Sequence, residues 1–187
     1  MCTTKPIRSY EDVKKLKNYF LNKGEYRNYL LVSVGLNTAL RICDILALKW
    51  SDVIYPNKRI KKYINITEAK TGKNTSIIIN KSFKSALKLY IKNVGIKGEY
   101  LFAGKSFKPI SRIYAFKLIK QAGRAVGLPY EISPHSLRKT FGYHAAKNGT
   151  PPAVLMQVYN HSSYEITKRY LGIDQDEKDR VFMDVAL

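Results

Sequence analysis

The sequence predicts a mainly helical domain with one small antiparallel β-sheet at an edge, an α+β class. Apolar residues recur at helical spacing through most of the chain. The period changes once, where two short segments rich in β-branched residues, "KYINIT" (62–67) and "TSIIIN" (75–80), lie close together. A chain of 187 residues, 45% of them hydrophobic, can bury one core. We therefore expect residues 1–187 to form a single domain.

The N-terminal part of the chain predicts three helices. Ser9, followed three residues later by Asp12, has the pattern of a capping box. Apolar residues repeat at helical spacing behind it: Val13, Leu16, Tyr19 and Phe20. Gly24 is expected to end this helix, and a second helix should run from about residue 25 to 36. A third is expected to start near Thr38, with Thr38 as its N-cap.

A hairpin and five more helices are expected in the rest of the chain. The polar segment "EAKTGKN" (68–74) has a central glycine and should form the turn between the two strands. A third strand is expected near residues 52–55. The helices beyond Asn80 are expected at about 81–94, 111–126, 134–148, 152–159 and 163–171.

Positive charge is the strongest global signal. The chain has 33 Lys and Arg against 14 Asp and Glu, a formal net charge of +19 and a pI near 9.9. Such an excess indicates a polyanionic partner, with nucleic acid first and an anionic membrane surface second. The basic residues are scattered rather than gathered on one amphipathic helix, and no apolar run approaches about 20 residues. Both observations weigh against a membrane.

The two cysteines and the N-terminus predict a cytoplasmic protein. Cys2 and Cys43 are too few for a disulfide framework or a metal quartet. The first twenty residues contain no apolar stretch of the kind found in signal peptides.

The last fourteen residues, 174–187, differ in composition from the rest. They contain five acidic and two basic residues, a net charge of −3 on a strongly basic chain. Four apolar residues could form a strip along this segment: Val181, Phe182, Val185 and Leu187. The segment is expected to avoid polyanions and to pack on protein, in cis or in trans, or else to be a disordered acidic tail.

The stretch "SPHSLR" (133–138) predicts an anion site at a helix start. Ser133 suits the N-cap and Pro134 the first helical position. His135 and Arg138, three residues apart, then lie on one face of the first turn, where free backbone N–H groups favour an anion. Taken alone, this pattern is also typical of a capped surface helix. His144 falls on the opposite face and is interpreted as structural.

Two further segments strengthen the interpretation. Arg41 lies in a similar setting near the start of the third helix, although an ion pair with Asp44 would also explain it. His161 precedes a short helix, for which Ser162 and Glu165 would form a capping box, and Tyr170 lies near its end. A phenol is a poor nucleophile, because its phenolate costs about 4 kcal/mol at pH 7. Arginines and a histidine nearby could offset that cost.

These residues carry a resemblance. The segments "TALRICDILALKWSDV", "EAKTGKNTSIII", "PHSLRKTF" and "NHSSYEITKRYL" resemble, in order and separation, the signature segments of the tyrosine recombinase (phage integrase) family. The likeness covers roughly residues 8–173. It implies that Tyr170 attacks a DNA phosphodiester, forms a 3′-phosphotyrosyl link and exchanges strands without a metal, ATP or any other cofactor.

The resemblance also implies roles for the other residues. Arg41 and Arg138 would bind the non-bridging oxygens, His135 would take or position the tyrosine proton, and His161 would hydrogen-bond the phosphate. Lys70 would protonate the leaving 5′ oxygen, with Lys73 of the same turn as the alternative, and Asp44 would orient groups in the site. DNA contacts are assigned to Lys73, Lys139 and Arg169.

The chain departs from the family pattern at three points. Lys139 stands where a histidine is frequent, and Tyr159-Asn160 stand where Leu-Gly is common. The family's usual N-terminal core-binding domain is absent from the sequence, which fits either an excised domain or a short natural enzyme.

Partners and alternatives follow from the same likeness. The expected partners are double-stranded DNA, further copies of the chain in a tetramer on DNA, and accessory DNA-bending or directionality proteins. The alternatives are a type IB topoisomerase-like nicking and resealing enzyme and a non-catalytic DNA-binding protein of the same fold. A metal-dependent nuclease is disfavoured, because no carboxylate cluster is found.

Overall fold

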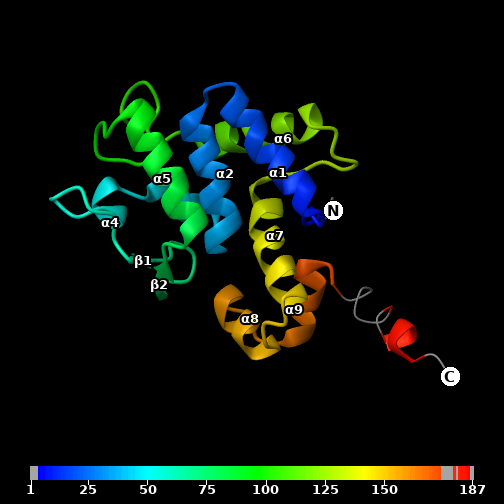
Figure 1. The fold of residues 1–187 in the computed structure, drawn as a ribbon. Coiled ribbons are helices and arrows are strands. Elements are labelled where there is room, and N and C mark those ends of the chain that lie inside the picture. The colour runs from blue at the N-terminus through cyan, green and yellow to red at the C-terminus, as the bar shows by residue number, and fades with distance from the viewer. Residues whose placement is uncertain (1–3, 174–178, 180, 186–187) are drawn as a thin grey trace.

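The computed structural model describes residues 4–173, 179 and 181–185, and within them the chain is mainly helical with one two-stranded antiparallel sheet (Figure 1). This confirms the predicted fold class. The helices and strands, in chain order, are α1 (Tyr10–Asn22), α2 (Tyr26–Thr38), α3 (Ile42–Ala47), α4 (Trp50–Val53), β1 (Tyr63–Thr67), β2 (Asn74–Ile78), α5 (Lys81–Val94), α6 (Arg112–Ala125), α7 (Pro134–Lys147), α8 (Pro152–Tyr159) and α9 (Tyr164–Leu171).

Helix α2 lies at the centre of the fold. Every residue from Leu30 to Leu36 is buried, because α1, α5 and α7 all pack against this helix. The approach of α7 is close enough to require a glycine, since a Cβ at Gly35 would lie 2.9 Å from Cδ1 of Leu137. The apolar core continues on both sides of α2, toward α5 and the hairpin and toward α1 and α6.

The hairpin projects from the edge of the domain near α4 and α5 (Figure 1). Its register pairs Tyr63 with Ile78 and Thr67 with Asn74, and Ile64 anchors it in the core. Gly72 in the turn has a φ of +66°, a conformation that favours glycine. The hairpin therefore presents its turn at the free end of two short strands.

The prediction of a third strand near residues 52–55 is wrong. Residues 50–53 form the short helix α4, because the Asp52 carboxylate accepts the Lys49 backbone N–H at 2.7 Å and closes its first turn. Only an isolated bridge between Ile54 and Ile60 remains of the strand.

Two predicted helix caps are also wrong. Thr38 does not begin α3 but ends α2, where its hydroxyl donates to the carbonyl of Val34 at 2.9 Å. Arg41 is the N-cap residue of α3 instead. Ser163, not Ser162, caps α9, since its Oγ accepts the N–H of Ile166 at 3.3 Å. The remaining helix bounds lie within about two residues of those expected.

The C-terminal half of α7 packs with α8 and α9 in a separate apolar cluster, which lies below the main body in Figure 1. Gly142 of α7 makes this packing possible, because a Cβ there would lie 2.5 Å from both Cδ2 of Leu171 and the hydroxyl of Tyr159. The N-terminal segment 4–8 runs along α7, where the N–H of Ile7 donates to Thr140 at 2.8 Å. His144 hydrogen-bonds the carbonyl of Ile7 at 3.0 Å, in agreement with its structural interpretation.

The described part of the tail exposes its apolar side chains. Residues 181–184 form a helical turn that stands apart from α9 in Figure 1. Val181, Phe182 and Val185 are between 60% and 81% exposed, so they do not pack on the body of this chain. Leu187, the last member of the predicted strip, lies outside the described residues. No helix in the described part of the chain is long and apolar enough to cross a bilayer.

Candidate active site

Arg138 is a buried arginine at the start of α7. Ser133 is the N-cap residue and Pro134 the first helical residue, as predicted, and Oγ of Ser136 accepts the Ser133 N–H at 3.1 Å. This start fixes the first turn, in which Arg138 is only 4% exposed. Its guanidinium carbon lies 5.0 Å from the ring centroid of Tyr159. The guanidinium is therefore held against the α8–α9 cluster.

Tyr159 ties that cluster to α7. It is fully buried, and its hydroxyl donates to the Arg138 backbone carbonyl at 2.7 Å. Burial raises its pKa far above the ordinary value of 10. Tyr159 is thus a structural phenol, although it lies directly beside the candidate nucleophile, with ring centroids 5.4 Å apart.

Tyr170 lies half-buried on α9 among cationic side chains. Burial raises the pKa of its phenol, while the charges of Arg138 and Arg41 and a side-chain hydrogen bond with Arg138 act to lower it. The ammonium of Lys139 lies 5.0 Å from the centroid of its ring. The phenol is consequently protonated at neutral pH, and its phenolate would form next to two arginines.

His161 lies edge-on to Tyr170, with the ring centroids 5.2 Å apart. Its Nδ1 is 3.1 Å from Oγ1 of Thr167, and the Thr167 hydroxyl donates to the carbonyl of Ser163 at 3.2 Å. Since that hydroxyl has one hydrogen, its oxygen accepts from Nδ1–H, and this assignment leaves the lone pair of the neutral ring on Nε2. Burial first, then Arg138 and Arg41, lower the pKa of His161.

Arg41 reaches the site from the start of α3 and forms an ion pair with Glu68. Asp44, one helical turn later, is buried, and its Oδ1 accepts the backbone N–H of Ala69 at 2.9 Å. The ion pair with Asp44, the alternative explanation for Arg41, is not the contact that the structure has. Asp44 instead holds the hairpin turn, which carries Lys70.

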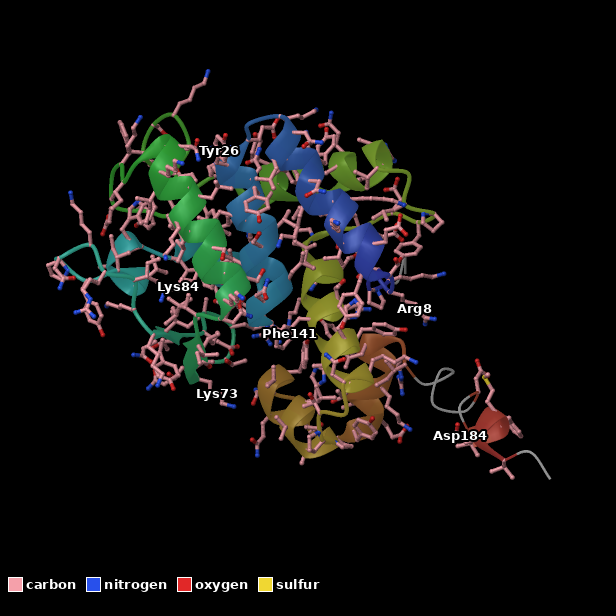
Figure 2. The ribbon with its side chains drawn as sticks, in the orientation of Figure 1. Arg8, Tyr26, Lys73, Lys84, Phe141 and Asp184 are labelled. Atoms are coloured by element: carbon pink, nitrogen blue, oxygen red, sulfur yellow. The ribbon has the colours of Figure 1, made fainter. Side chains whose placement is uncertain are left out.

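The two turn lysines differ in their surroundings. Lys73 is directed toward α8, where its Nζ is 3.4 Å from the carbonyl of Gln157, and Figure 2 shows its side chain on that side of the hairpin. Lys70 is exposed, and its charge acts on the ring of His135. This placement favours Lys70 as the lysine of the site, which stays a prediction.

His135 lies at the meeting point of these charges. Although the residue is exposed, partial desolvation of its ring lowers its pKa, and four cations lower it further, in the order Arg138, Lys139, Arg41 and Lys70. The imidazole is therefore neutral at pH 7 and can accept a proton. The candidate site thus brings together Arg41, Arg138, His135, His161 and Tyr170, with Lys70 and Lys139 beside them.

The two other residues predicted to contact DNA, Arg169 and Lys139, differ in their exposure. Arg169 is exposed on α9 beside Tyr170. Lys139 is turned inward, where its Nζ donates to the carbonyl of Thr4 at 2.7 Å and burial lowers its pKa. Among the described residues, no three His, Cys, Asp or Glu side chains gather where they could hold a metal ion.

Sequence reasoning missed Glu68 and Thr167. Both are buried polar residues that hold a site residue, Arg41 and His161 respectively. The sequence places Glu68 two residues before Lys70 in "EAKTG". A carboxylate in a polar turn is usually exposed, so the sequence does not predict that its side chain is buried.

Comparison with known proteins identifies this arrangement. The sequence model described as the phage integrase family matches residues 9–177. The chain belongs to that family. As the signature segments predicted, it has the catalytic domain of a tyrosine recombinase.

Relatives of this integrase-family chain include a protein of similar length. This chain is 44% identical over 177 residues to the probable integrase/recombinase YoeC of Bacillus subtilis (strain 168). The match covers 94% of this chain and 93% of that protein. The chain is 26% identical to the tyrosine recombinase XerA of Pyrococcus furiosus, covering 87% of this chain and 56% of XerA. The chain therefore spans about half the length of some recombinases that it matches.

Solved structures share the fold of this family member. A crystal structure of XerA recombinase superposes with a TM-score of 0.77 at 23% identity, covering 97% of this chain and 66% of that one. The XerH site-specific recombinase bound to palindromic difH, a post-cleavage complex, gives a TM-score of 0.74 at 19% identity, covering 96% and 52%.

Proposed function

We propose that this chain breaks and rejoins DNA by site-specific strand exchange, with Tyr170 as nucleophile. Its Oη attacks the scissile phosphorus and forms a phosphotyrosyl bond to the 3′ side, while the bond from phosphorus to the 5′ oxygen breaks. A 5′-hydroxyl from another strand then attacks the same phosphorus and releases the tyrosine. The number of phosphoester bonds is conserved, so the proposed cycle includes no metal, ATP or other cofactor.

The observation that carries this proposal is the setting of Tyr170. Its phenol hydrogen-bonds the side chain of Arg138 and lies within the field of Arg41, although burial alone would keep it inert. Two fixed guanidinium groups can bind the non-bridging oxygens and stabilise the charge that accumulates in the pentavalent transition state.

The histidines and the lysine supply proton transfer in this scheme. Neutral His135 accepts the Tyr170 proton, directly or through a water molecule. Lys70 in the hairpin turn gives a proton to the leaving 5′ oxygen. The negative charge of a bound phosphodiester raises the pKa of His161, and the charged ring then donates to the phosphate from Nε2.

DNA and further copies of the chain are the proposed partners, acting in the cytoplasm. The net charge of +19 supports DNA binding. Structural neighbours include a lambda integrase dimer bound to a COC′ core site and a lambda integrase tetramer bound to a Holliday junction. By that likeness we propose a tetramer on DNA, with Arg169 and Lys73 contacting the backbone. Accessory proteins stay a prediction.

A covalent-adduct assay tests the chemistry. The protein is incubated in EDTA with a pool of nicked duplexes of randomised sequence, and adducts that resist SDS are recovered and sequenced. Wild type should form an adduct and Tyr170→Phe should form none. Tyr164→Phe, on the same helix, is the matched control and should react like wild type.

The outcomes separate the alternatives. An adduct formed by Tyr170→Phe would overturn the assignment of the nucleophile. Relaxation of any supercoiled plasmid without recombinant products would favour the topoisomerase-like enzyme. DNA binding with no adduct formed from any duplex of the pool would favour the non-catalytic binding protein.

A further inference from the structure

The hairpin buries a carboxylate against one of the two proposed phosphate-binding arginines. Glu68 is the first residue after β1, and its side chain is only 7% exposed. It forms the ion pair with Arg41, whose own side chain is 18% exposed. A buried carboxylate is costly unless its charge is paired and its oxygens are hydrogen-bonded, so this contact needs a physical reason.

Both carboxylate oxygens are held by the hairpin itself. Oε2, which accepts from Arg41, also accepts the hydroxyl of Thr71 at 3.2 Å, and Oε1 accepts the hydroxyl of Thr75 at 3.2 Å. The Glu68 backbone closes the turn, since its N–H donates to Lys73 and its carbonyl accepts from Gly72, both at 2.9 Å. The carboxylate is therefore a fixed part of the turn.

The geometry leaves Arg41 able to bind a phosphate. A guanidinium has five N–H donors in a rigid plane, and the contact with Glu68 is made through Nη1 alone. Fixing one amino group of a planar fork fixes the direction of all the other donors. Glu68 thus orients the guanidinium without covering it.

The same turn carries Lys70, and a second carboxylate steadies it. Asp44 holds the N–H of Ala69, the residue between Glu68 and Lys70. Arg41 and Asp44 both belong to the start of α3. Two contacts therefore join α3 to the turn on either side of the peptide that leads into Lys70.

We propose that Glu68 is a positioning residue for strand cleavage, which orients the Arg41 guanidinium toward the scissile phosphate and ties it to the turn that carries Lys70. This inference rests on the proposed function. It assigns Glu68 no contact with DNA and no proton transfer, so its whole effect passes through Arg41 and the turn.

The test compares single-turnover rates of adduct formation on a nicked duplex recovered with the wild type. Glu68→Gln keeps the shape of the side chain but removes the charge that faces Arg41. It should slow cleavage by roughly tenfold to a hundredfold, because small misplacements of a catalytic group have effects of that order. Glu99→Gln, which removes an exposed carboxylate paired with Lys49, is the matched control and should change the rate less than about twofold.

A double-mutant cycle distinguishes positioning from general damage to the fold. If Glu68 acts through Arg41, Glu68→Gln should have little effect when Arg41 is already alanine. Its effect should also shrink on a duplex whose scissile phosphate is a neutral methylphosphonate, because Arg41 then has no anion to meet. The ion pair should slow rotation of the Arg41 guanidinium in the wild type. NMR signals of this group should therefore show faster rotation in Glu68→Gln.

Each contrary result is informative. An unchanged rate in Glu68→Gln, or an equal loss in the Arg41→Ala background and on methylphosphonate, would overturn the positioning role. A faster rate would mean that Glu68 competes with the phosphate for Arg41, which also overturns it. If the wild type forms no adduct with any duplex, the proposed function itself fails, whereas the NMR comparison still shows whether Glu68 holds Arg41.

Discussion

At the scale of single residues, the site has to offset the low nucleophilicity of a protonated tyrosine. A phenolate costs about 4 kcal/mol at pH 7, and the burial of Tyr170 adds to that cost. The charges of Arg138 and Arg41 reduce this cost in the free protein. They can stabilise the phenolate fully only when another group accepts the phenol proton. Neutral His135 can accept this proton, because partial desolvation and then the surrounding cations lower the pKa of its ring. The two arginines therefore favour both the phenolate of Tyr170 and the neutral ring of His135.

The pH dependence of cleavage follows from the lowered pKa of His135. The ring loses its base function only when it is protonated, which happens below its ordinary pKa of 6.5 rather than around it. The second-order rate constant of adduct formation at low DNA concentration reports the free protein, and it should therefore stay level from about pH 8 to pH 6.5 and fall at lower pH. His135→Gln should react slowly, with a weaker acidic limb. A wild-type rate that falls with a midpoint above 6.5 would contradict this role.

At the scale of elements, α7 organises the site. Its first turn carries His135 and Arg138, its middle packs on α2 through Leu137, and Gly142 admits the α8–α9 cluster that carries the nucleophile. The N-terminal segment also contacts the end of α9, since the Arg8 side chain donates a hydrogen bond to the carbonyl of Gly172 at 2.8 Å (Figure 2). The distance between Arg138 and Tyr170 thus depends on how closely two helices approach one glycine.

Gly142→Ala tests that dependence. The added Cβ would lie 2.5 Å from both Leu171 and Tyr159, so α9 must move or α7 must bend. We expect a loss of about 1–3 kcal/mol in the free energy of unfolding by denaturant, as overpacking generally costs, together with slower cleavage. Gly104→Ala is the control, since its Cβ would meet nothing closer than 3.7 Å. Equal stability of the two variants would show that the cluster can shift freely.

Local sequence signals predicted the elements well, and tertiary contacts explain the failures. Asn80 caps α5 through the N–H of Phe83, so its start was readable from the sequence. The start of α3 was not, because Ala39 takes a left-handed conformation that only the surrounding packing selects. The signature segments contain most of the side chains that the structure brings together in the candidate site. They did not reveal Glu68, whose burial depends on the fold of the hairpin onto α3.

At the scale of the whole molecule, charge divides the chain into two parts. The net charge of +19 suits the body for DNA, whereas residues 174–187 carry a net −3. In the described part of that tail, Phe182 and Met183 are each 81% exposed. Large apolar side chains that the body of the chain does not cover are suited to bind protein. Strand exchange as proposed needs more than one copy of the chain, so we predict that these side chains pack on a second copy.

Phe182→Asp should therefore separate cleavage from exchange. Adduct formation needs only the site within one copy and should stay within about twofold of wild type, whereas recombinant product should fall by roughly tenfold or more, because one aromatic anchor of an interface is commonly worth 2 kcal/mol or more. Ile113→Asp, which places the same charge at an apolar position of α6 that is 70% exposed, is the matched control. Both products are measured on the same duplex. Equal loss of adduct and recombinant would place Phe182 in the fold of its own chain, and unchanged exchange would remove the tail from the assembly.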